Sequence, residues 1–328
     1  MHKKDLAAQY LRDYPELNKS QIARRLQHDH PLLFKTVESA RDVVRYATGA
    51  QCNKRKHCAV KDVAYIGSTS SVENWGIPKS YAREWNPYNL TQSKYLVLSD
   101  VHLPYHSSIA LEAALDYGYK NGIKNIILNG DCLDFYQLSR FERNPDYRKF
   151  SEELETWHDF AKVLQFNFKG QIVYKEGNHE ERYGKFIASR APELYGVNDF
   201  NLNQLLKLEQ YGIEWVSEKR PMHFGDLTIL HGHEYSFGVF SPVNVARGLF
   251  LRAKTSSLCG HHHQTSQHQE RDLRGNEVIT YSVGCLSELH PAYMPLNKWN
   301  HGFAIIERNG NDFAVDNLRI DSNGRVHR

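Results

Sequence analysis

The chain has 328 residues, of which 41% are hydrophobic and 24% are charged, and its formal net charge at pH 7 is +3. This length allows one large domain with a small appendage or two ordinary domains, and the composition is typical of a globular protein with a hydrophobic core. The net charge is too small to indicate a partner. The five cysteines form no C-x-x-C pair, which excludes a disulfide framework and a zinc ribbon and favours a reducing compartment.

No membrane or export segment is expected. The first residues lack the apolar stretch of a secretory signal, and no apolar run is long enough to span a bilayer. We therefore expect a cytoplasmic protein without a membrane partner.

Residues 1–60 predict a small helical domain that resembles a helix-turn-helix unit. Helical spacing of apolar residues predicts short helices around 6–11, after Ser20 as N-cap, and over about 33–46, with Gly49 as the stop. Residues 1–62 hold 13 Lys/Arg and 7 Asp/Glu, a local net charge of +6. Two interpretations stay open for this region: nucleic-acid binding, or a solvated appendage that supports folding or oligomerisation.

Residues 61–93 predict a linker or an extended arm, and residues 94–328 predict an α/β domain. Four short apolar runs, at 95–98, 126–128, 172–174 and 227–230, are each followed directly by a polar motif. Such runs predict buried strands, and the helical stretches at 108–121 and 151–168 indicate a sheet covered by helices. Extended segments at 277–283, 302–307 and 313–318 predict a second sheet packed on the first.

Five polar motifs carry the residues that can bind metal ions. They read Asp100-Val101-His102, Gly130-Asp131-Cys132-Leu133-Asp134, Gly177-Asn178-His179-Glu180, His231-Gly232-His233 and Gly260-His261-His262-His263. A loop that leaves a strand can turn alternate side chains to one side, and the glycines allow unusual backbone angles and close approach. Carboxylate, imidazole and amide groups suit divalent metals of hard or borderline character. Because the candidates exceed what one ion can use, we expect two ions that share a carboxylate.

In this order the motifs resemble the signature of the calcineurin-like metallophosphoesterases, over roughly residues 94–265. The chain also resembles phage-encoded and bacterial members of that family that carry a small helical N-terminal region. The resemblance implies a layered αββα sandwich after the helical domain. It implies hydrolysis of a phosphomonoester or phosphodiester substrate by a hydroxide that bridges two divalent metal ions. Manganese is the metal we expect, and iron, zinc and nickel are compatible with the same ligands.

The resemblance also assigns roles to residues. The ligands of the first metal would be Asp100, His102 and His263; Asp131 would bridge both metals; and the second metal would be completed by Asn178, His231 and His261. His179 would remain unligated and protonate the leaving oxygen, with its orientation fixed by Asp134. Arg182 and Arg140 are candidates to neutralise the phosphoryl oxygens, although an ordinary surface ion pair explains either alone.

Several neighbouring residues stay ambiguous. The resemblance selects His231 and the outer members of the run 261–263, so His233 and His262 are interpreted as supporting or substrate-facing. Cys132 and Cys259 are interpreted as small buried fillers. Tyr281, Tyr293 and Trp299 could line a substrate pocket, but packing in the core or at the rim is the simpler interpretation.

Two alternative functions remain open. The first keeps the chemistry and makes the chain a nuclease or other nucleic-acid phosphodiesterase guided by residues 1–60. The second is a DNA-binding scaffold with a structural metal site, against which the complete ligand set and the unligated His179 both argue.

Overall fold

A computed structural model of the chain describes residues 2–49, 80–82, 84–139, 149–217, 219–235 and 243–328. The chain forms two compact units, Met1–Arg83 and Glu84–Arg328. Within the described residues, every helix is too short or too polar to cross a bilayer. Most of the expected linker lies outside these residues, and its described end contains the short strand β1 (Tyr88–Asn89).

The first unit contains three helices, α1 (Lys3–Asp13), α2 (Lys19–Asp29) and α3 (Val37–Ala47). Ser20 was the wrong N-cap for α2, because the side chain of Asn18 accepts the N–H groups of Ser20 and Gln21 while Gln21 bonds back to the Asn18 N–H. Thr36 caps α3 in the same way, so this helix begins later than its apolar pattern predicted.

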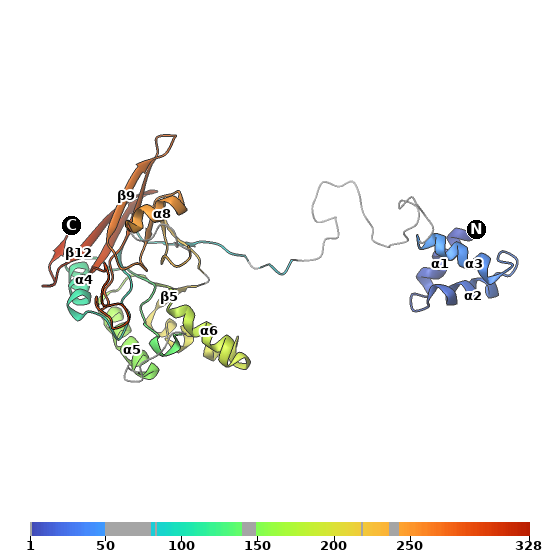
Figure 1. Ribbon diagram of the computed structural model, residues 1–328, viewed down its shortest axis with the longest axis horizontal. Helices are drawn as coiled ribbons and strands as arrows, with labels where there is room; N and C mark the ends of the chain where they lie inside the picture. The colour runs from blue at the N-terminus through green and yellow to red at the C-terminus, as the bar shows by residue number, and fades with distance from the viewer. Residues whose placement is uncertain (1, 50–79, 83, 140–148, 218, 236–242) are drawn as a thin grey trace. The chain divides into compact units, whose positions relative to one another are not determined.

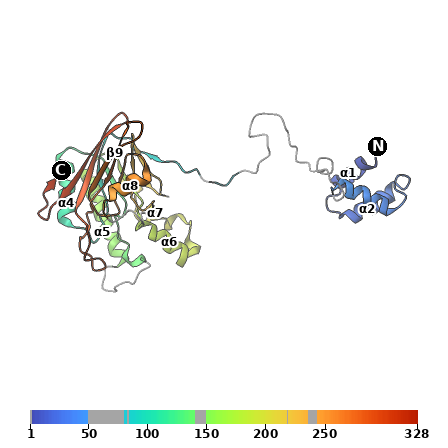
Figure 2. The ribbon, with the colours of Figure 1, turned by 45° about the horizontal axis from the view of Figure 1, so that its top comes forward.

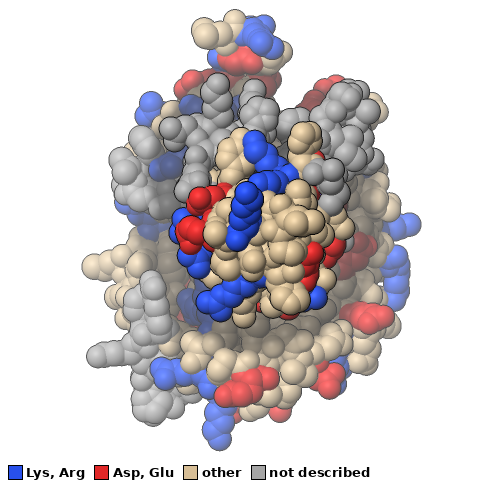
Figure 3. All heavy atoms as spheres, turned by 90° about the vertical axis from the view of Figure 1, so that its right-hand side faces the viewer, with Lys and Arg blue, Asp and Glu red and all other residues tan. Residues whose placement is uncertain are grey.

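The helical unit has a hydrophobic core of its own. Apolar faces of all three helices meet there, with Leu6, Ile22, Leu26, Phe34 and Val44 almost fully buried. Its described residues 2–49 carry nine Lys/Arg and six Asp/Glu. In the view of Figure 3, Lys and Arg side chains are interspersed with Asp and Glu side chains among the described residues, and neither sign covers a broad area.

The second unit is built on two β-sheets. The larger sheet has the order β13-β12-β11-β2-β3-β4-β5, and the smaller has the order β1-β6-β7-β8-β10-β9. The larger sheet contains β2 (Lys94–Leu98), β3 (Ile126–Asn129), β4 (Ile172–Lys175), β5 (Ile213–Val216), β11 (Gly302–Asn309), β12 (Asp312–Ile320) and β13 (Val326–His327). Besides β1, the smaller sheet contains β6 (Met222–Phe224), β7 (Leu227–Ile229), β8 (Ser257–Cys259), β9 (Ser266–Arg271) and β10 (Glu277–Ser282).

These sheets pack face to face between two helical layers, as Figures 1 and 2 show. Alternate residues of the larger sheet, such as Val97 and Ile127, face Phe224 and Leu258 of the smaller sheet in one core. The opposite face of the larger sheet packs on α4 (Ser108–Lys120) and α5 (Phe150–Asn167). On the outer side of the smaller sheet, Leu230 and Cys259 pack on α8 (Val245–Ala253). The predicted layered αββα sandwich is therefore confirmed.

One part of the predicted sheet arrangement was wrong. Strands β11 and β12 were expected in a second sheet, but β11 pairs antiparallel with β2 and extends the first sheet. Residues 302–306 are buried without interruption, which suits a strand inside a covered sheet. The apolar run at 227–230 was expected in the first sheet, but it forms β7 of the smaller sheet, which runs parallel to β8.

The direction of the strands places the polar motifs together. Strands β2, β3, β4 and β5 are parallel neighbours, and β7 and β8 are parallel to each other in the facing sheet. The five motifs directly follow β2, β3, β4, β7 and β8. Side chains that follow parallel strands collect at the carboxyl edge of a sheet, which is where ligands bind in α/β folds.

Candidate metal centre

Three groups of acidic and imidazole side chains meet at this edge. In each group, one candidate ligand atom per residue lies within 4.8 Å of the others. The groups are Asp100, His102 and His263; Asp131, His231 and His261; and His102, Asp131 and His179. The structure thus brings six of the seven residues expected to bind metal into such groups, and the seventh, Asn178, adjoins the second group.

The first group directs two imidazole nitrogens at one point. His102 Nδ1 lies 2.9 Å from Asp134 Oδ1, so this nitrogen donates and, in the neutral ring, the lone pair is on Nε2. That Nε2 lies 3.3 Å from His263 Nε2, which is 3.2 Å from Asp100 Oδ1. Only a proton or a cation between these atoms can make such an arrangement of acceptors favourable.

In the second group, too, an imidazole Nε2 faces side-chain atoms that accept hydrogen bonds. His231 Nδ1 lies 2.7 Å from the carbonyl oxygen of Asn129, which can only accept, so Nδ1 carries a proton. His231 Nε2 then faces Asp131 Oδ2 at 3.2 Å and Asn178 Oδ1 at 3.3 Å. A backbone carbonyl that fixes the tautomer of a histidine is the usual support of a metal-binding imidazole. The donor set therefore fits a divalent cation.

The pKa values of the side chains at this site are shifted by the buried carboxylates and by burial itself. Burial alone lowers the pKa of His231, but the Asp131 carboxylate more than compensates and raises it to about 10. Burial and the neighbouring His231 lower the pKa of His261 to about 3, so its ring is neutral and ready to bind metal. Burial disfavours the charged form of Asp131, yet the adjacent His231 and His179 hold its pKa well below its usual range.

Unusual backbone angles aim the ligands. Five of them have left-handed φ values, with Asp100 at 54°, His102 at 53°, Asp131 at 49°, His261 at 66° and His263 at 56°. Such conformations cost about 1–3 kcal/mol each in residues other than glycine, and they concentrate at functional sites. The first and last motifs thus direct their ligands by left-handed turns, where simple alternation in an extended loop was expected.

Glycines of the motifs allow the loops to approach one another. Gly130 has a φ of 84°, and an added Cβ would lie 2.4 Å from His231 Nδ1. An added Cβ at Gly177 would lie 2.2 Å from Asp131 Oδ1, and one at Gly260 would lie 1.8 Å from Ser99 Oγ and 2.6 Å from Asp100 Oδ2. Gly130 allows a positive φ, whereas Gly177 and Gly260, which lack a side chain, leave room for the neighbouring loop.

Two buried glutamates hold the loops in place, and neither was assigned a role from the sequence. The carboxylate of Glu180 accepts the N–H groups of Asp131, Cys132, Leu133 and Gly177 and the hydroxyl of Tyr174. It therefore ties the second motif to the third.

Glu234 does the same for the fourth motif. It accepts the N–H groups of His231 and Gly232 and pairs at 2.8 Å with the fully buried Lys175. Burial raises the pKa of Glu234, but Lys175 more than offsets this and brings it to about 2. Each glutamate directly follows a histidine, His179 or His233, but this adjacency alone did not reveal its role.

His179, Asp134 and Arg182 form a hydrogen-bonded cluster beside the ligands. His179 Nδ1 lies 2.6 Å from the Asp134 carbonyl oxygen and 3.3 Å from its carboxylate. Arg182 donates one N–H to the same carbonyl at 2.9 Å and another to His179 Nε2 at 2.8 Å. The Asp134 carboxylate is shared, because it also bonds His102. Asp134 thus contacts the ring it was expected to orient, mainly through its backbone.

The remaining candidates lie apart or cannot be placed. His233 Nε2 contacts Glu181 Oε1 at 2.9 Å, and neither His233 nor His262 belongs to the three groups formed by the described residues. Tyr281 lies in the core between the sheets, and Cys132 and Cys259 are buried. Arg140 lies outside the described residues.

Comparisons with known proteins give only distant likenesses. No family model matches the chain, and no curated protein matches it. Among solved structures, Vps29 from Entamoeba histolytica in complex with zinc is 14% identical, covers 71% of this chain and 96% of its own, and has a TM-score of 0.37. The Pseudomonas putida nuclease MPE is 14% identical over 68% of this chain and 87% of its own, with a TM-score of 0.31.

The phosphoesterase Yfce from E. coli is 12% identical over 68% of this chain and 98% of its own, with a TM-score of 0.32. All three TM-scores are below 0.5, so the chemistry assigned to the site below rests on the arrangement of its own side chains.

Gly260→Ala tests the close approach of the loops. The new methyl group would displace Ser99 and Asp100, so we expect divalent-metal affinity to fall at least tenfold while the fold persists. Gly184→Ala in α6 (Glu180–Arg190) is the matched control, because an added Cβ there contacts nothing within 4 Å. Calorimetric titration of both metal-free variants with Mn²⁺ would measure the effect, and equal affinities would contradict this geometry.

Proposed function

We propose that this chain is a metal-dependent phosphoesterase that binds two divalent cations at the carboxyl edge of its sheets. The observation that supports the proposal most is that buried carboxylates and imidazole nitrogens converge in two groups, with His231 Nε2 3.2 Å from Asp131 Oδ2 and His263 Nε2 3.2 Å from Asp100 Oδ1. The order of the five motifs, which resembles the calcineurin-like metallophosphoesterases, points to the same chemistry. Buried carboxylates of this kind require a compensating cation, either a protonated imidazole or a bound metal ion.

Asp131 is the residue suited to bridge the two ions. It belongs both to the group with His102, on the first side, and to the group with His231 and His261, on the second. Asp100, His102 and His263 would hold one ion, and Asn178, His231 and His261 would complete the other. When bound, two divalent cations lower the pKa of a shared water and polarise phosphoryl oxygens. Manganese, iron, zinc and nickel all suit these ligands, and we propose manganese.

His179 is proposed as a proton donor and not as a ligand, although its ring lies within reach of Asp131 and His102. The reason is Arg182, whose guanidinium already donates to His179 Nε2 at 2.8 Å. A metal ion on that nitrogen would be repelled by the guanidinium charge. Burial lowers the pKa of His179, but Asp131 and Asp134 outweigh it and raise the pKa above its usual value. When Arg182 turns to neutralise phosphoryl charge it releases His179 Nε2, and that nitrogen can then carry a proton toward a leaving oxygen.

The substitutions Asp131→Asn and His179→Ala distinguish the proposed metal-bridging role of Asp131 from the proposed proton-donating role of His179. Asp131→Asn removes the shared carboxylate, so we expect loss of bound metal and of activity on aryl phosphoesters. His179→Ala leaves the ligand groups intact, so metal content should persist while kcat falls by about 10²–10⁴, the usual contribution of a general acid. Metal analysis and rate measurements on the same preparations decide the matter. Full turnover by either variant would contradict these roles.

Metal binding should depend on pH because metal and proton compete for the same imidazoles. His231 has a raised pKa in the metal-free protein, so it is protonated at pH 7 and must release that proton to bind a cation. The apparent affinity for Mn²⁺ should therefore rise with pH, by about tenfold per unit for one displaced proton. Calorimetry in buffers of different ionisation enthalpy would count the protons, and affinity without proton release would contradict the arrangement.

A second candidate keeps the chemistry and directs it to nucleic acid through the helical unit. Helices α2 and α3 pack on a shared core, and Lys19, Arg24 and Arg25 lie exposed on α2. Arg41 and Arg45 of α3 lie in ion pairs with Glu38 and Asp42, which makes the surface less basic than its composition.

Binding of duplex DNA at several salt concentrations tests this candidate. If the helical unit guides the protein, affinity should fall steeply with salt, and this dependence should vanish on deletion of residues 1–60. An unchanged salt dependence in the deleted chain would instead assign any DNA binding to the second unit. Tight metal binding without turnover on any phosphoester would favour the scaffold alternative.

A further inference from the structure

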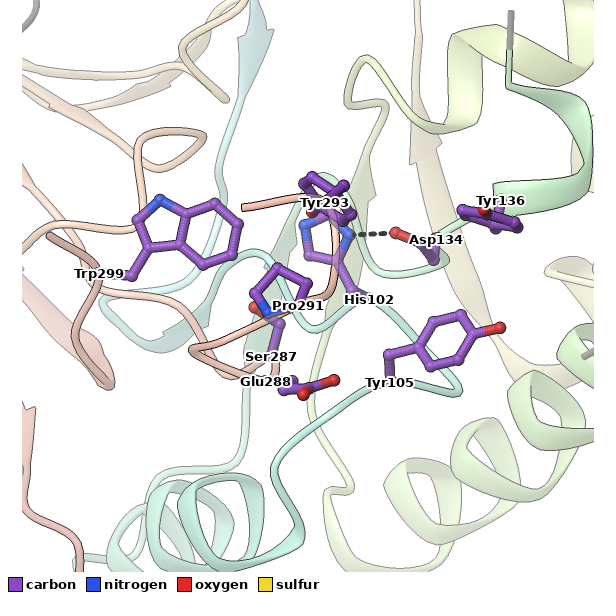
Figure 4. A pocket seen from close by; sticks show the side chains of 9 residues that line it. All are labelled: His102, Tyr105, Asp134, Tyr136, Ser287, Glu288, Pro291, Tyr293 and Trp299. Carbon is purple, nitrogen blue, oxygen red and sulfur yellow. Dashed lines mark hydrogen bonds and ion pairs between the residues drawn. The ribbon is translucent and has the colours of Figure 1, made fainter. Parts of the chain in front are cut away.

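An aromatic pocket opens beside the first ligand group. Figure 4 shows that it shares His102 and Asp134 with the metal centre, with Trp299 on one side of His102 and Tyr105 and Tyr136 on the other. Tyr293 and Pro291 complete the group of ring-bearing side chains. A phosphate held at the metal centre would place its organic substituent next to these rings.

Three separate parts of the chain supply the rings and hold them in place. Tyr105 follows β2, Tyr136 begins the 3₁₀ helix η3 (Tyr136–Leu138), and Tyr293 and Trp299 lie between β10 and β11. The Trp299 ring packs against the ligand His263, with 4.2 Å between ring centroids, and Tyr293 lies 6.4 Å from Trp299.

The segment that carries Tyr293 and Trp299 is internally braced. The side-chain amide of Asn297 donates to the carbonyl oxygens of Leu289 and Met294 at 2.6 and 2.8 Å. Its side-chain oxygen accepts the N–H of Trp299 at 2.9 Å. Tyr293 is nevertheless 62% exposed, so its ring is accessible from solvent. A preformed, open aromatic surface of this kind suits stacking of a planar ring.

The charge of the residues that line the pocket further limits which chemical group can bind there. Among the described residues that line the pocket, none is Lys or Arg, and two are acidic, Asp134 and Glu288. The lining therefore disfavours a second phosphate or a carboxylate and favours a neutral planar group. Glu288, at the exposed rim, can accept a hydrogen bond from an exocyclic amine or a ring N–H.

We propose that this pocket binds the nucleobase of a nucleotidyl phosphoester by stacking on Tyr293 and Trp299. The inference rests on the proposed function, since the metal centre anchors the phosphate. It assigns the substrate class as a nucleotide, either a free nucleotide ester or a residue of a single strand, and it makes Tyr293 and Trp299 determinants of specificity.

Binding of two products that differ only in the base tests the proposal without requiring turnover. The full chain reconstituted with Mn²⁺ would be titrated with thymidine 5′-monophosphate and with 2-deoxyribose 5-phosphate by calorimetry. We expect the nucleotide to bind about tenfold more tightly, the order of magnitude of one stacking contact. Tyr293→Ala and Trp299→Ala should bring the ratio of the two Kd values close to one, and Trp299→Phe should retain most of it.

Tyr119→Ala is the matched control, because Tyr119 is also exposed, at 63%, but lies at the far end of α4 from the ligand loops. The ratio of the two Kd values in this variant should equal that of the unaltered chain. Equal affinities for the two ligands, or a preference that survives Tyr293→Ala and Trp299→Ala, would overturn the proposal. A preference for the base in a protein that hydrolyses no phosphoester would instead contradict the proposed function and leave the pocket assignment standing.

A third ligand tests whether the bound nucleotide is free or part of a single strand. A 5′-phosphorylated strand of about five thymidines should bind more tightly than the mononucleotide if the natural substrate is a single strand, because each further stacked base adds affinity. Equal affinity would identify a free nucleotide ester. Either result supports the pocket, provided that the affinity depends on Tyr293 and Trp299.

Discussion

The structure depends on carboxylates buried among imidazoles at one edge of two facing sheets. Asp100, Asp131 and Asp134 are 0%, 1% and 6% exposed. Charged groups so far from water are tolerated only when cations or hydrogen-bond donors compensate them. The surrounding imidazoles supply part of this compensation as protonated rings, and each such ring must release its proton before that nitrogen can bind a metal ion. A pair of divalent cations would satisfy both kinds of ligand at once.

Much of the surrounding architecture keeps these groups in place. Five candidate ligands adopt left-handed backbone angles, which would relax in an isolated loop. Glu180 prevents this by accepting four backbone N–H groups from two motifs, and Glu234 binds the backbone of a third. The candidate ligands are therefore held in place by hydrogen bonds of the protein itself. Preorganisation of this kind raises affinity and allows a polar site to stabilise charge that develops during a reaction.

How far the sequence could predict this structure varied from element to element. Strands β2, β3 and β4 were predictable because each is an uninterrupted apolar run that ends in a polar motif. The full set of candidate ligands was not predicted from these runs but from the resemblance that the five motifs carry in their order. Register and pairing were not predictable, so β11 and β12 were placed in the wrong sheet.

The support of the site was also beyond the sequence. Glu180 and Glu234 look like ordinary surface acids until the loops fold over them. The pocket's rings come from segments almost 200 residues apart in the chain, from Tyr105 to Trp299, and no local pattern connects them. Tyr293 and Trp299 do line a pocket, whereas Tyr281 is buried between the sheets, in keeping with the simpler interpretation of core packing.

The central claim is that the two ligand groups hold two ions joined by the Asp131 carboxylate. Electron paramagnetic resonance of metal-free protein titrated with Mn²⁺, together with the number of ions bound per chain, tests it most directly. The account predicts two bound ions per chain and the spectrum of a spin-coupled pair, since a bridging carboxylate brings the ions within about 4 Å of each other. A single uncoupled ion per chain, or no binding at all, would contradict it.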